Sequence, residues 1–378
     1  MELPVIAGDI PHLAEVVPSL LSALGVDGSS GTIELPEVSR AAVLLVDGLG
    51  WDLLDEHAAD APVLSALSRS PLRVGYPATT AAGLAAIGTG MTSGEHGMAG
   101  YTFEVPGVGV LNALRWCRHS DGQDLRHVLP SEELQPLPTT FSTAAEAGLT
   151  TSVVSPYEFA GSALTGAVLR GGKYVGVHAL GDLASATLDA LRPSRAFCYA
   201  YHSQLDTIGH LHGPGSPAWR MQLRQVDRLV ESIVEGLPGG ALLAVVADHG
   251  MIRLDETTAI DIDETPALLE GVRELAGEVR ARHVYPELGA APDVLAAWRE
   301  TLGQRAWVLE REEAIELGWF GPRVSARVLP RIGEVVAAAR DRSGMLRGLA
   351  EPVESTLVGQ HGSFTSAEQL VPLALAYG

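Results

Sequence analysis

Two continuous apolar runs, each followed at once by an aspartate, constrain the fold of this chain more than any other feature. The first run, Ala41 to Val46, leads into Asp47, and the second, Ala241 to Ala247, leads into Asp248. Apolar runs without polar alternation are typical of parallel strands covered by helices on both faces. Ligands of such sheets bind at the carboxyl ends of the strands. Both aspartates are therefore candidate ligand-binding residues.

The rest of the chain alternates between segments with strand patterns and segments with helix patterns. This alternation predicts an α/β fold with a largely parallel central sheet flanked by helices. Further strands are expected over 72–74, 150–154 and 196–201, and helices over 51–57, 81–87, 140–147, 181–191 and 219–234. The apolar segment 371–376 is expected to dock on this sheet. Residues 105–138 are interpreted as an irregular excursion, and 155–166 and 202–217 as loops.

The sequence pattern changes between Ile252 and Glu354, where short and more charged segments replace the long apolar runs. This change predicts an inserted cap or subdomain over 252–354. The core would then comprise residues 1–251 together with 355–378.

Composition excludes several classes of partner. The net charge of −20 argues against a surface for nucleic-acid backbones or anionic membranes, which need clustered Lys and Arg. No apolar run approaches the roughly 18 residues of a membrane span, and the first residues lack the pattern of a signal peptide. A cytoplasmic protein is therefore expected. Cys198 stands in an apolar run, where a buried reduced thiol is the default.

Side chains suited to metal ions stand after strands or in loops at four places. These are Asp47, Asp206 with His210, Asp248 with His249, and His361. Nitrogen and carboxylate donors suit zinc or a similar divalent ion. Six side chains are too many for one catalytic metal that keeps an open position, but they suit two metals that share a substrate oxygen. The spacing of Asp206 and His210 lets one helical turn or a tight loop present both to one ion.

A pair of hydroxyls precedes a run of small residues. Thr79 and Thr80 follow Pro77, and the run from Ala81 to Ile87 predicts a short helix. A hydroxyl at a helix N-terminus lies where N–H groups and the helix dipole favour negative charge. That position suits either a plain helix cap or a group that holds a phosphate or an alkoxide.

Taken together, these motifs resemble the alkaline phosphatase superfamily, and within it the type I phosphodiesterase and nucleotide pyrophosphatase branch. The matching stretches occur in the order of the family: Val46-Asp47-Gly48, Tyr76-Pro77 through Thr80 to Thr89-Gly90, Glu95-His96-Gly97, Asp206-Thr207-Ile208-Gly209-His210 with Gly213-Pro214, Ala247-Asp248-His249-Gly250-Met251, and His361-Gly362. The resemblance implies an alkaline-phosphatase-like sheet and a centre of two zinc ions that acts on a small anionic phosphoester.

The resemblance also assigns roles to these residues. One metal would be held by Asp47, Asp248 and His249 with the hydroxyl of Thr80, and the other by Asp206, His210 and His361. Thr80 would be the nucleophile that attacks phosphorus in line. A water would then hydrolyse the phospho-threonine intermediate.

Substrate contacts are expected at three further residues. The family pattern has an Asn that contacts phosphate three residues after the nucleophile, where this chain has Gly83, so that a backbone N–H would have to replace the side chain. Tyr157 or Phe159 would stack on a base or aryl group, or simply pack near a strand end. Arg170 and Lys173 are either phosphate contacts or solvated surface charges.

Other reactions of the superfamily remain open at this stage. The alternatives are a phosphomonoesterase, a phosphonate or sulfate ester hydrolase, a phosphomutase, or a non-catalytic relative that binds an anion. Neither Cys117 nor Cys198 stands at the position of the nucleophile, which argues against a sulfatase.

Overall fold

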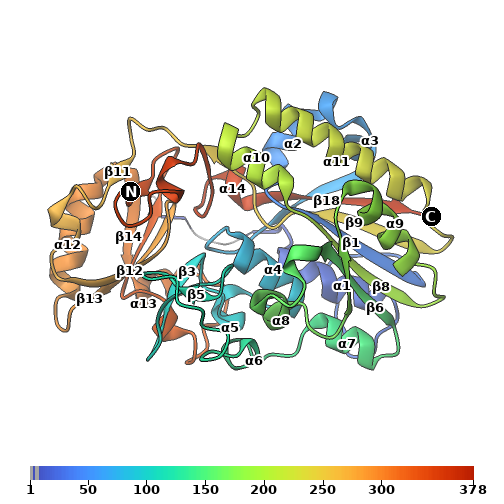
Figure 1. Cartoon of the computed structure of the whole chain (residues 1–378), viewed down its shortest axis with the longest axis horizontal. Coiled ribbons are helices and arrows are strands. Elements are labelled where there is room, and N and C mark those ends of the chain that lie inside the picture. The colour runs from blue at the N-terminus through green and yellow to red at the C-terminus, as the bar shows by residue number, and fades with distance from the viewer. Residues whose placement is uncertain (1–2, 5–7) are drawn as a thin grey trace.

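The molecule is organised around a seven-stranded sheet with the order β2-β18-β9-β1-β8-β6-β7 (Figure 1). The computed structural model describes residues 3–4 and 8–378. The strands of this sheet are β1 (Arg40–Val46), β2 (Ser68–Arg73), β6 (Thr150–Pro156), β7 (Lys173–Val177), β8 (Ala196–His202), β9 (Ala241–Val246) and β18 (Leu370–Tyr377).

β1 lies at the centre of the sheet and pairs in parallel with β8 on one side and β9 on the other. Every residue of β8 and β9 is buried, as their unbroken apolar sequences predict. β18 runs antiparallel between β9 and β2. The expected α/β fold with a largely parallel sheet is therefore confirmed, and the terminal apolar segment docks on the sheet as predicted.

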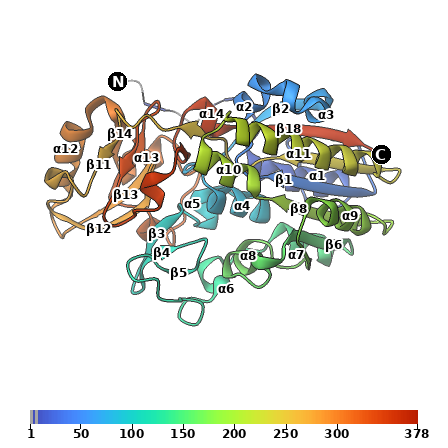
Figure 2. The same cartoon turned by 45° about the horizontal axis from the view of Figure 1, so that its top comes forward.

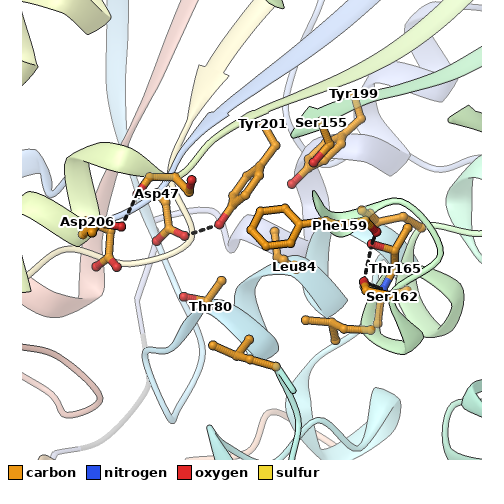
Figure 3. A pocket seen from close by; sticks show the side chains of 16 residues that line it. Asp47, Thr80, Leu84, Ser155, Phe159, Ser162, Thr165, Tyr199, Tyr201 and Asp206 are labelled. Atoms are coloured by element: carbon orange, nitrogen blue, oxygen red, sulfur yellow. Dashed lines mark hydrogen bonds between the residues drawn. The ribbon is translucent and has the colours of Figure 1, made fainter. Parts of the chain in front are cut away.

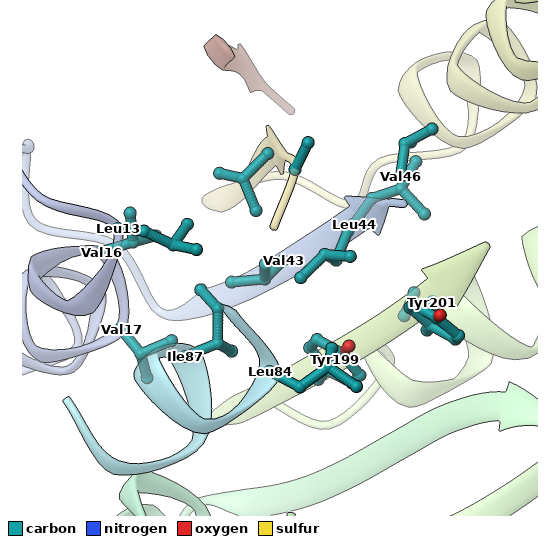
Figure 4. Packing of buried hydrophobic residues seen from close by; sticks show 14 of the residues in the cluster. Leu13, Val16, Val17, Val43, Leu44, Val46, Leu84, Ile87, Tyr199 and Tyr201 are labelled. Atoms are coloured by element: carbon teal, nitrogen blue, oxygen red, sulfur yellow. The ribbon is translucent and has the colours of Figure 1, made fainter. Parts of the chain in front are cut away.

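Helices cover both faces of the sheet (Figures 1 and 2). They are α1 (Val16–Ala23), α2 (Trp51–Glu56), α3 (Pro62–Ala66), α4 (Thr80–Thr89), α7 (Thr140–Glu146), α8 (Ala163–Val168), α9 (Leu180–Ala190), α10 (Gln204–His212) and α11 (Pro217–Glu235). α9 packs with α11, whereas α4 packs with α1, α7 and α8. Figure 4 shows Leu84 and Ile87 of α4 directed toward β1 and β8. Because α4 consists of small and apolar residues, it is buried on nearly all sides.

Three predicted segments differ from the structure. Residues 204–212 form the helix α10 instead of a loop, because Leu205 and Gly209 are buried against the core. The predicted loop after β6 contains α8, and β7 follows it. The strand expected over 72–74 is β2, which begins at Ser68 because its pairing with β18 extends that far.

The segment 252–354 contains a second sheet with its own apolar core, at the left of Figure 1. Its strands are antiparallel, in the order β12 (Val272–Glu278), β13 (Ala281–Pro286), β15 (Val335–Ala339) and β14 (Ala306–Glu310). α12 (Ala291–Leu302) buries Trp298 against this sheet, and α13 (Arg311–Glu316) follows β14. The short strands β11 (Ile260–Asp261) and β16 (Met345–Leu346) pair in parallel beside it. The division into core and insert stays a prediction.

The expected irregular excursion is instead ordered as a small sheet of β3 (Thr102–Val105), β4 (Gly109–Asn112) and β5 (Cys117–Arg118). It packs on β12, where the Thr102 hydroxyl donates to the Gly277 carbonyl over 2.8 Å. The N–H of Gly277 donates back to the same hydroxyl, also over 2.8 Å. The small sheet and the second sheet therefore form one continuous wall facing the core.

Two connections fix this wall to the core. β10 (Ile252–Arg253) pairs with β17 (Gly359–Gln360) where the chain leaves the core and returns. Beside it, Arg280 and Glu368 of α14 (Ser366–Gln369) form a fully buried ion pair through two hydrogen bonds of 3.0 and 2.7 Å. Glu368 also accepts from the N–H of Ser363 and the hydroxyl of Thr365. No helix in the described ranges is long and apolar enough to cross a membrane.

Replacing Glu368 should destabilise the protein strongly. In Glu368→Ala the Arg280 guanidinium stays buried without its partner, which costs about 3–5 kcal/mol in the free energy of unfolding. Urea unfolding followed by circular dichroism measures the change. The matched control is Asp189→Ala, which breaks the exposed pair with Arg192 and should leave the unfolding midpoint nearly unchanged. A midpoint of Glu368→Ala equal to that of the control would contradict the structural role of this pair.

Candidate active site

Asp47 and Asp248 lie side by side because they follow neighbouring parallel strands, β1 and β9. Both are buried, as is His249 beside them. Nε2 of His249 lies 3.3 Å from Oδ1 of Asp47 and 3.8 Å from Oδ2 of Asp248. The ligand atoms of these three residues are close enough together to hold one metal ion.

α10 supplies the next two predicted ligands. Asp206 and His210 are one helical turn apart, and Nε2 of His210 lies 3.4 Å from Oδ2 of Asp206. The ligand atoms of Asp206, His249 and His361 form a second group that could hold a metal ion. His210 lies just outside this group, although its ring is 5.1 Å from that of His361 between centroids. The structure therefore brings all six predicted side chains to one place.

The three histidines share one hydrogen-bonding arrangement. Nδ1 of His210 contacts the carbonyl of Gly359 at 2.7 Å, Nδ1 of His249 that of Gly250 at 2.9 Å, and Nδ1 of His361 that of Ala78 at 2.8 Å. A carbonyl only accepts, so each Nδ1 carries the proton and donates. In a neutral ring this leaves the Nε2 lone pair for a metal, which is the arrangement that metal-binding histidines adopt.

Each of the three aspartates has one buried oxygen without a hydrogen-bond partner in the described part of the chain. These atoms are Oδ1 of Asp47, Oδ1 of Asp206 and Oδ2 of Asp248. The other oxygen of Asp47, Oδ2, accepts from the Tyr201 hydroxyl (Figure 3). Buried carboxylates are costly unless they are paired or bind a cation. The unpaired oxygens therefore fit a cationic group at this edge of the sheet.

The pKa values of the candidate ligands are also shifted, and their causes show how closely the carboxylates and histidines interact. Burial raises the pKa of Asp206 to about 6, and Asp47 adds to the rise while His210 opposes it. Burial and the Asp47 carboxylate hold the pKa of Asp248 well above its usual range. Burial disfavours the charged ring of His249, but Asp248 and Asp47 outweigh it and raise the pKa of His249. Burial and the neighbouring His249 lower the pKa of His361.

Thr80 is the first residue of α4, and its hydroxyl lies 3.2 Å from Nε2 of His249. Thr79 precedes the helix and is buried. A helix that begins at Thr80 leaves the N–H groups of its first turn without acceptors inside the helix. The N–H of Gly83, however, donates to the carbonyl of Thr79 over 2.9 Å. The Gly83 N–H is therefore paired within the helix, and the phosphate contact expected at the start of α4 stays a prediction.

Two cavities meet at Thr80. The first, which we call the apolar cavity, measures about 210 Å³. Besides Asp47 and Thr80 it is lined by Leu84, Phe159, Leu164, Val168, Leu169, Tyr199 and Tyr201, with several hydroxyl side chains (Figure 3). The second, which we call the charged cavity, measures about 270 Å³ and lies against the wall of the small and second sheets. Besides Thr80 it is lined by Tyr101, Arg115, His210, Glu278, Glu354 and His361, among others.

The remaining predicted contacts separate into two groups. Phe159 lines the apolar cavity, whereas Tyr157 is exposed and packs against the ring of His178. Arg170 donates to the carbonyls of Ala167 and Leu137, and Lys173 is exposed at the start of β7. Neither cation lines the two cavities.

Sequence reasoning missed four residues at the site. Tyr199 and Tyr201 stand two residues apart on β8, and their shared face was the available signal. Arg115 and Glu278 reach the charged cavity from the small sheet and from β12, respectively. No local sequence pattern predicts either position. Burial raises the pKa of Glu278 to about 8, an effect that the Thr79 hydroxyl opposes.

Comparisons with known proteins place this site in a family. A family model for type I phosphodiesterase/nucleotide pyrophosphatase matches residues 41–364. Among curated proteins, GPI ethanolamine phosphate transferase 3 from Schizosaccharomyces pombe (strain 972) is 34% identical over 70 residues, or 18% of this chain. The match covers only 8% of that protein's length.

Solved structures share the fold at low identity. Murine ectonucleotide pyrophosphatase/phosphodiesterase 5, as an inactive variant with AMP, is 17% identical with a TM-score of 0.68, covering 89% of this chain and 87% of that one. Phosphonoacetate hydrolase from Sinorhizobium meliloti 1021, with phosphonoformate, is 19% identical with a TM-score of 0.68, covering 90% and 91%. With the family model matching most of its length, this chain belongs to the type I phosphodiesterase/nucleotide pyrophosphatase family and is a hydrolase of that kind.

Proposed function

We propose that this chain hydrolyses phosphodiester or phosphoanhydride bonds of a small anionic substrate, with Thr80 as the nucleophile. The observation that carries the proposal is the position of the Thr80 hydroxyl, 3.2 Å from Nε2 of His249 and beside carboxylates with unpaired oxygens. A hydroxyl becomes a strong nucleophile where its surroundings favour the alkoxide. AMP and phosphonoformate, the ligands in the two similar structures, are small anions of the proposed kind.

The donor set fits two divalent cations, and we propose zinc. One would be held by Asp47, Asp248, His249 and Thr80, and the other by Asp206, His210 and His361. The fit rests on the unpaired carboxylate oxygens and on the three Nε2 atoms that the backbone carbonyls leave available. Carboxylate and imidazole donors suit zinc in catalytic sites. When bound, the cations would offset the charge of the phosphoryl group and favour the deprotonated form of a hydroxyl or water.

The side chains and the backbone of the site have separate roles in the proposed reaction. Oγ1 of Thr80 forms a bond to phosphorus while the bond from phosphorus to the leaving oxygen breaks, and the leaving oxygen ends as an alcohol or phosphate. A water then attacks the phospho-threonine, the bond between phosphorus and Oγ1 breaks, and Thr80 regains its proton. The unpaired N–H groups at the start of α4 orient the phosphoryl oxygens. Tyr201 holds Asp47 in place through Oδ2.

The two cavities favour a diester over a monoester. A diester carries two substituents on phosphorus, and both cavities open on Thr80. Among the described residues that line the charged cavity, Arg115 stands beside carboxylates such as Glu278 and Glu354, which suits a substituent with further polar groups. Phosphonate hydrolysis is the second candidate, because the phosphonoacetate hydrolase structure matches this chain with the same TM-score of 0.68.

Removing the Thr80 hydroxyl should abolish turnover. Thr80→Ala is expected to lower kcat for bis(4-nitrophenyl) phosphate on the order of 10³-fold or more, because the attacking oxygen is lost. Thr80→Ser keeps the oxygen and should retain measurable activity. The matched control is Thr79→Ala, which removes the neighbouring hydroxyl and should keep turnover within about tenfold of wild type. Full activity in Thr80→Ala would contradict the proposal.

Comparing substrates tests the reaction type. The wild type should hydrolyse bis(4-nitrophenyl) phosphate with a kcat/KM at least about tenfold above that for 4-nitrophenyl phosphate, because only the diester fills both cavities. Release of phosphate from phosphonoacetate is measured in parallel. A faster monoester would support a phosphomonoesterase, and faster phosphonoacetate cleavage would support the second candidate.

Metal removal should cost both stability and activity. Dialysis against a chelator is expected to abolish hydrolysis, and added Zn²⁺ should restore it. Zn²⁺ at 100 times its Kd should also stabilise the folded chain by about 2.7 kcal/mol for each site, seen as a rise in Tm. The rise should be smaller in His361→Ala. An unchanged Tm, with no metal detected by elemental analysis, would exclude the proposed centre.

A further inference from the structure

The hydroxyl of Tyr199 is a buried polar group that the proposed reaction does not use. Tyr199 is fully buried on β8, and its hydroxyl has no hydrogen-bond partner in the described part of the chain. Its ring packs edge-on against Phe141 at 5.9 Å and beside Tyr201 at 6.4 Å. Buried side-chain polar atoms nearly always have a partner, so the Tyr199 hydroxyl is an unusual group that a ligand could satisfy.

This hydroxyl faces the apolar cavity. Figure 3 places Asp47 and Thr80 on one side of the cavity and Tyr199 on the other, with Phe159 between them. A ligand that reacts at Thr80 and extends through the cavity would therefore bring its outer edge to Tyr199.

Three other hydroxyls of this cavity already have partners within the chain. The Tyr201 hydroxyl donates to Asp47. Ser162 donates to Thr165 over 2.9 Å, and the Thr165 hydroxyl donates to the carbonyl of Phe159. Burial, with the nearby carboxylates of Asp248 and Asp47, holds the pKa of Tyr199 well above its usual range, so its hydroxyl keeps its proton and can donate.

The size of the cavity limits what it can take. An apolar cavity of about 150 Å³ in another protein is large enough to bind benzene. The apolar cavity here measures about 210 Å³, and its walls include Leu84, Val168 and the ring of Phe159. These dimensions and walls suit one aromatic ring with a small substituent, which Phe159 can contact with its own ring.

We propose that Tyr199 is a specificity-determining residue, whose hydroxyl donates to a hydrogen-bond acceptor on the outer edge of an aromatic substituent of the substrate. This inference rests on the proposed function, because it takes the reacting phosphoryl group to lie at Thr80. The substrate class that follows is a phosphoester with a planar, mostly apolar ring that carries an acceptor opposite its point of attachment. An aliphatic substituent, or a ring without an acceptor, leaves the hydroxyl unpaired.

The test compares two ligands that differ only in the acceptor. The probes are 4-acetylphenylphosphonate and 4-isopropylphenylphosphonate, which have similar shapes and lack the phosphoester oxygen that leaves in the proposed reaction. Their Kd values are measured by calorimetry on the zinc-loaded protein. Wild type should bind the acetyl compound about tenfold more tightly, the size expected for one neutral hydrogen bond to an otherwise unpaired group. In Tyr199→Phe this ratio should fall to about one, with binding of the isopropyl compound unchanged.

Two control variants separate specificity from general damage. Tyr377→Phe removes an exposed hydroxyl at the end of β18 that does not line the apolar cavity, and it should keep the tenfold ratio. Tyr201→Phe should weaken both ligands equally, because it loosens Asp47. Tyr199→Phe should also keep or raise the Tm, since the lost hydroxyl has no partner in the protein, which would exclude misfolding as the cause.

The outcomes distinguish this inference from the proposed function. Equal binding of the two compounds by wild type, or a ratio that Tyr199→Phe leaves intact, would overturn the role of Tyr199 while the phosphoester function stands. Failure of both phosphonates to bind would overturn the inference, whereas the proposed function is judged separately by the turnover of bis(4-nitrophenyl) phosphate in wild type and in Thr80→Ala.

Discussion

The rest of the structure depends on three carboxylates that the fold forces together at one edge of its sheet. Parallel pairing of β1 with β9 sets Asp47 beside Asp248, and α10 adds Asp206. Burial and neighbouring carboxylates raise the pKa of Asp206 and of Asp248, so a positive charge among them favours their ionised forms. The backbone carbonyls that accept from Nδ1 of His210 and His361 leave the Nε2 atom of each ring available as a ligand. The site is therefore organised for positive charge that comes from outside the chain.

The segment 252–354 contacts this centre as well as shaping its surface. His361 directly follows β17, whose partner strand β10 opens the insert. Glu368, which binds Arg280 at the turn between β12 and β13, also accepts from the N–H of Ser363, two residues after His361. The position of a proposed ligand thus depends on a buried ion pair between the two parts of the molecule. The charged cavity lies along this junction, so its shape follows the same contacts.

The predictable part of the site was the part encoded locally. Asp47 and Asp248 were found because each directly follows an apolar strand, and Asp206 with His210 because their spacing lets one helical turn or a tight loop present both to one ion. The helix itself was missed because Gly209 lies in a Gly- and His-rich segment, but a Cβ there would approach Sδ of Met251 to 2.6 Å, so packing decides its conformation. The small sheet was missed because Thr102 finds its partner in Gly277, far along the chain. Tyr199 was not predicted because it lies within an apolar run, where a side chain is expected to pack in the core.

The missing side chain at position 83 has a packing explanation. A Cβ on Gly83 would lie 2.4 Å from Cβ of Asp248, and one on Gly88 would lie 1.8 Å from the carbonyl oxygen of Val168. Both contacts are too short for any larger residue, so α4 needs its glycines to lie against the end of β9 and against α8. This close approach places Thr80 beside His249 and Val168 in the wall of the apolar cavity. Gly83 therefore has a packing role, because its lack of a side chain lets Thr80 lie beside His249 and the carboxylates.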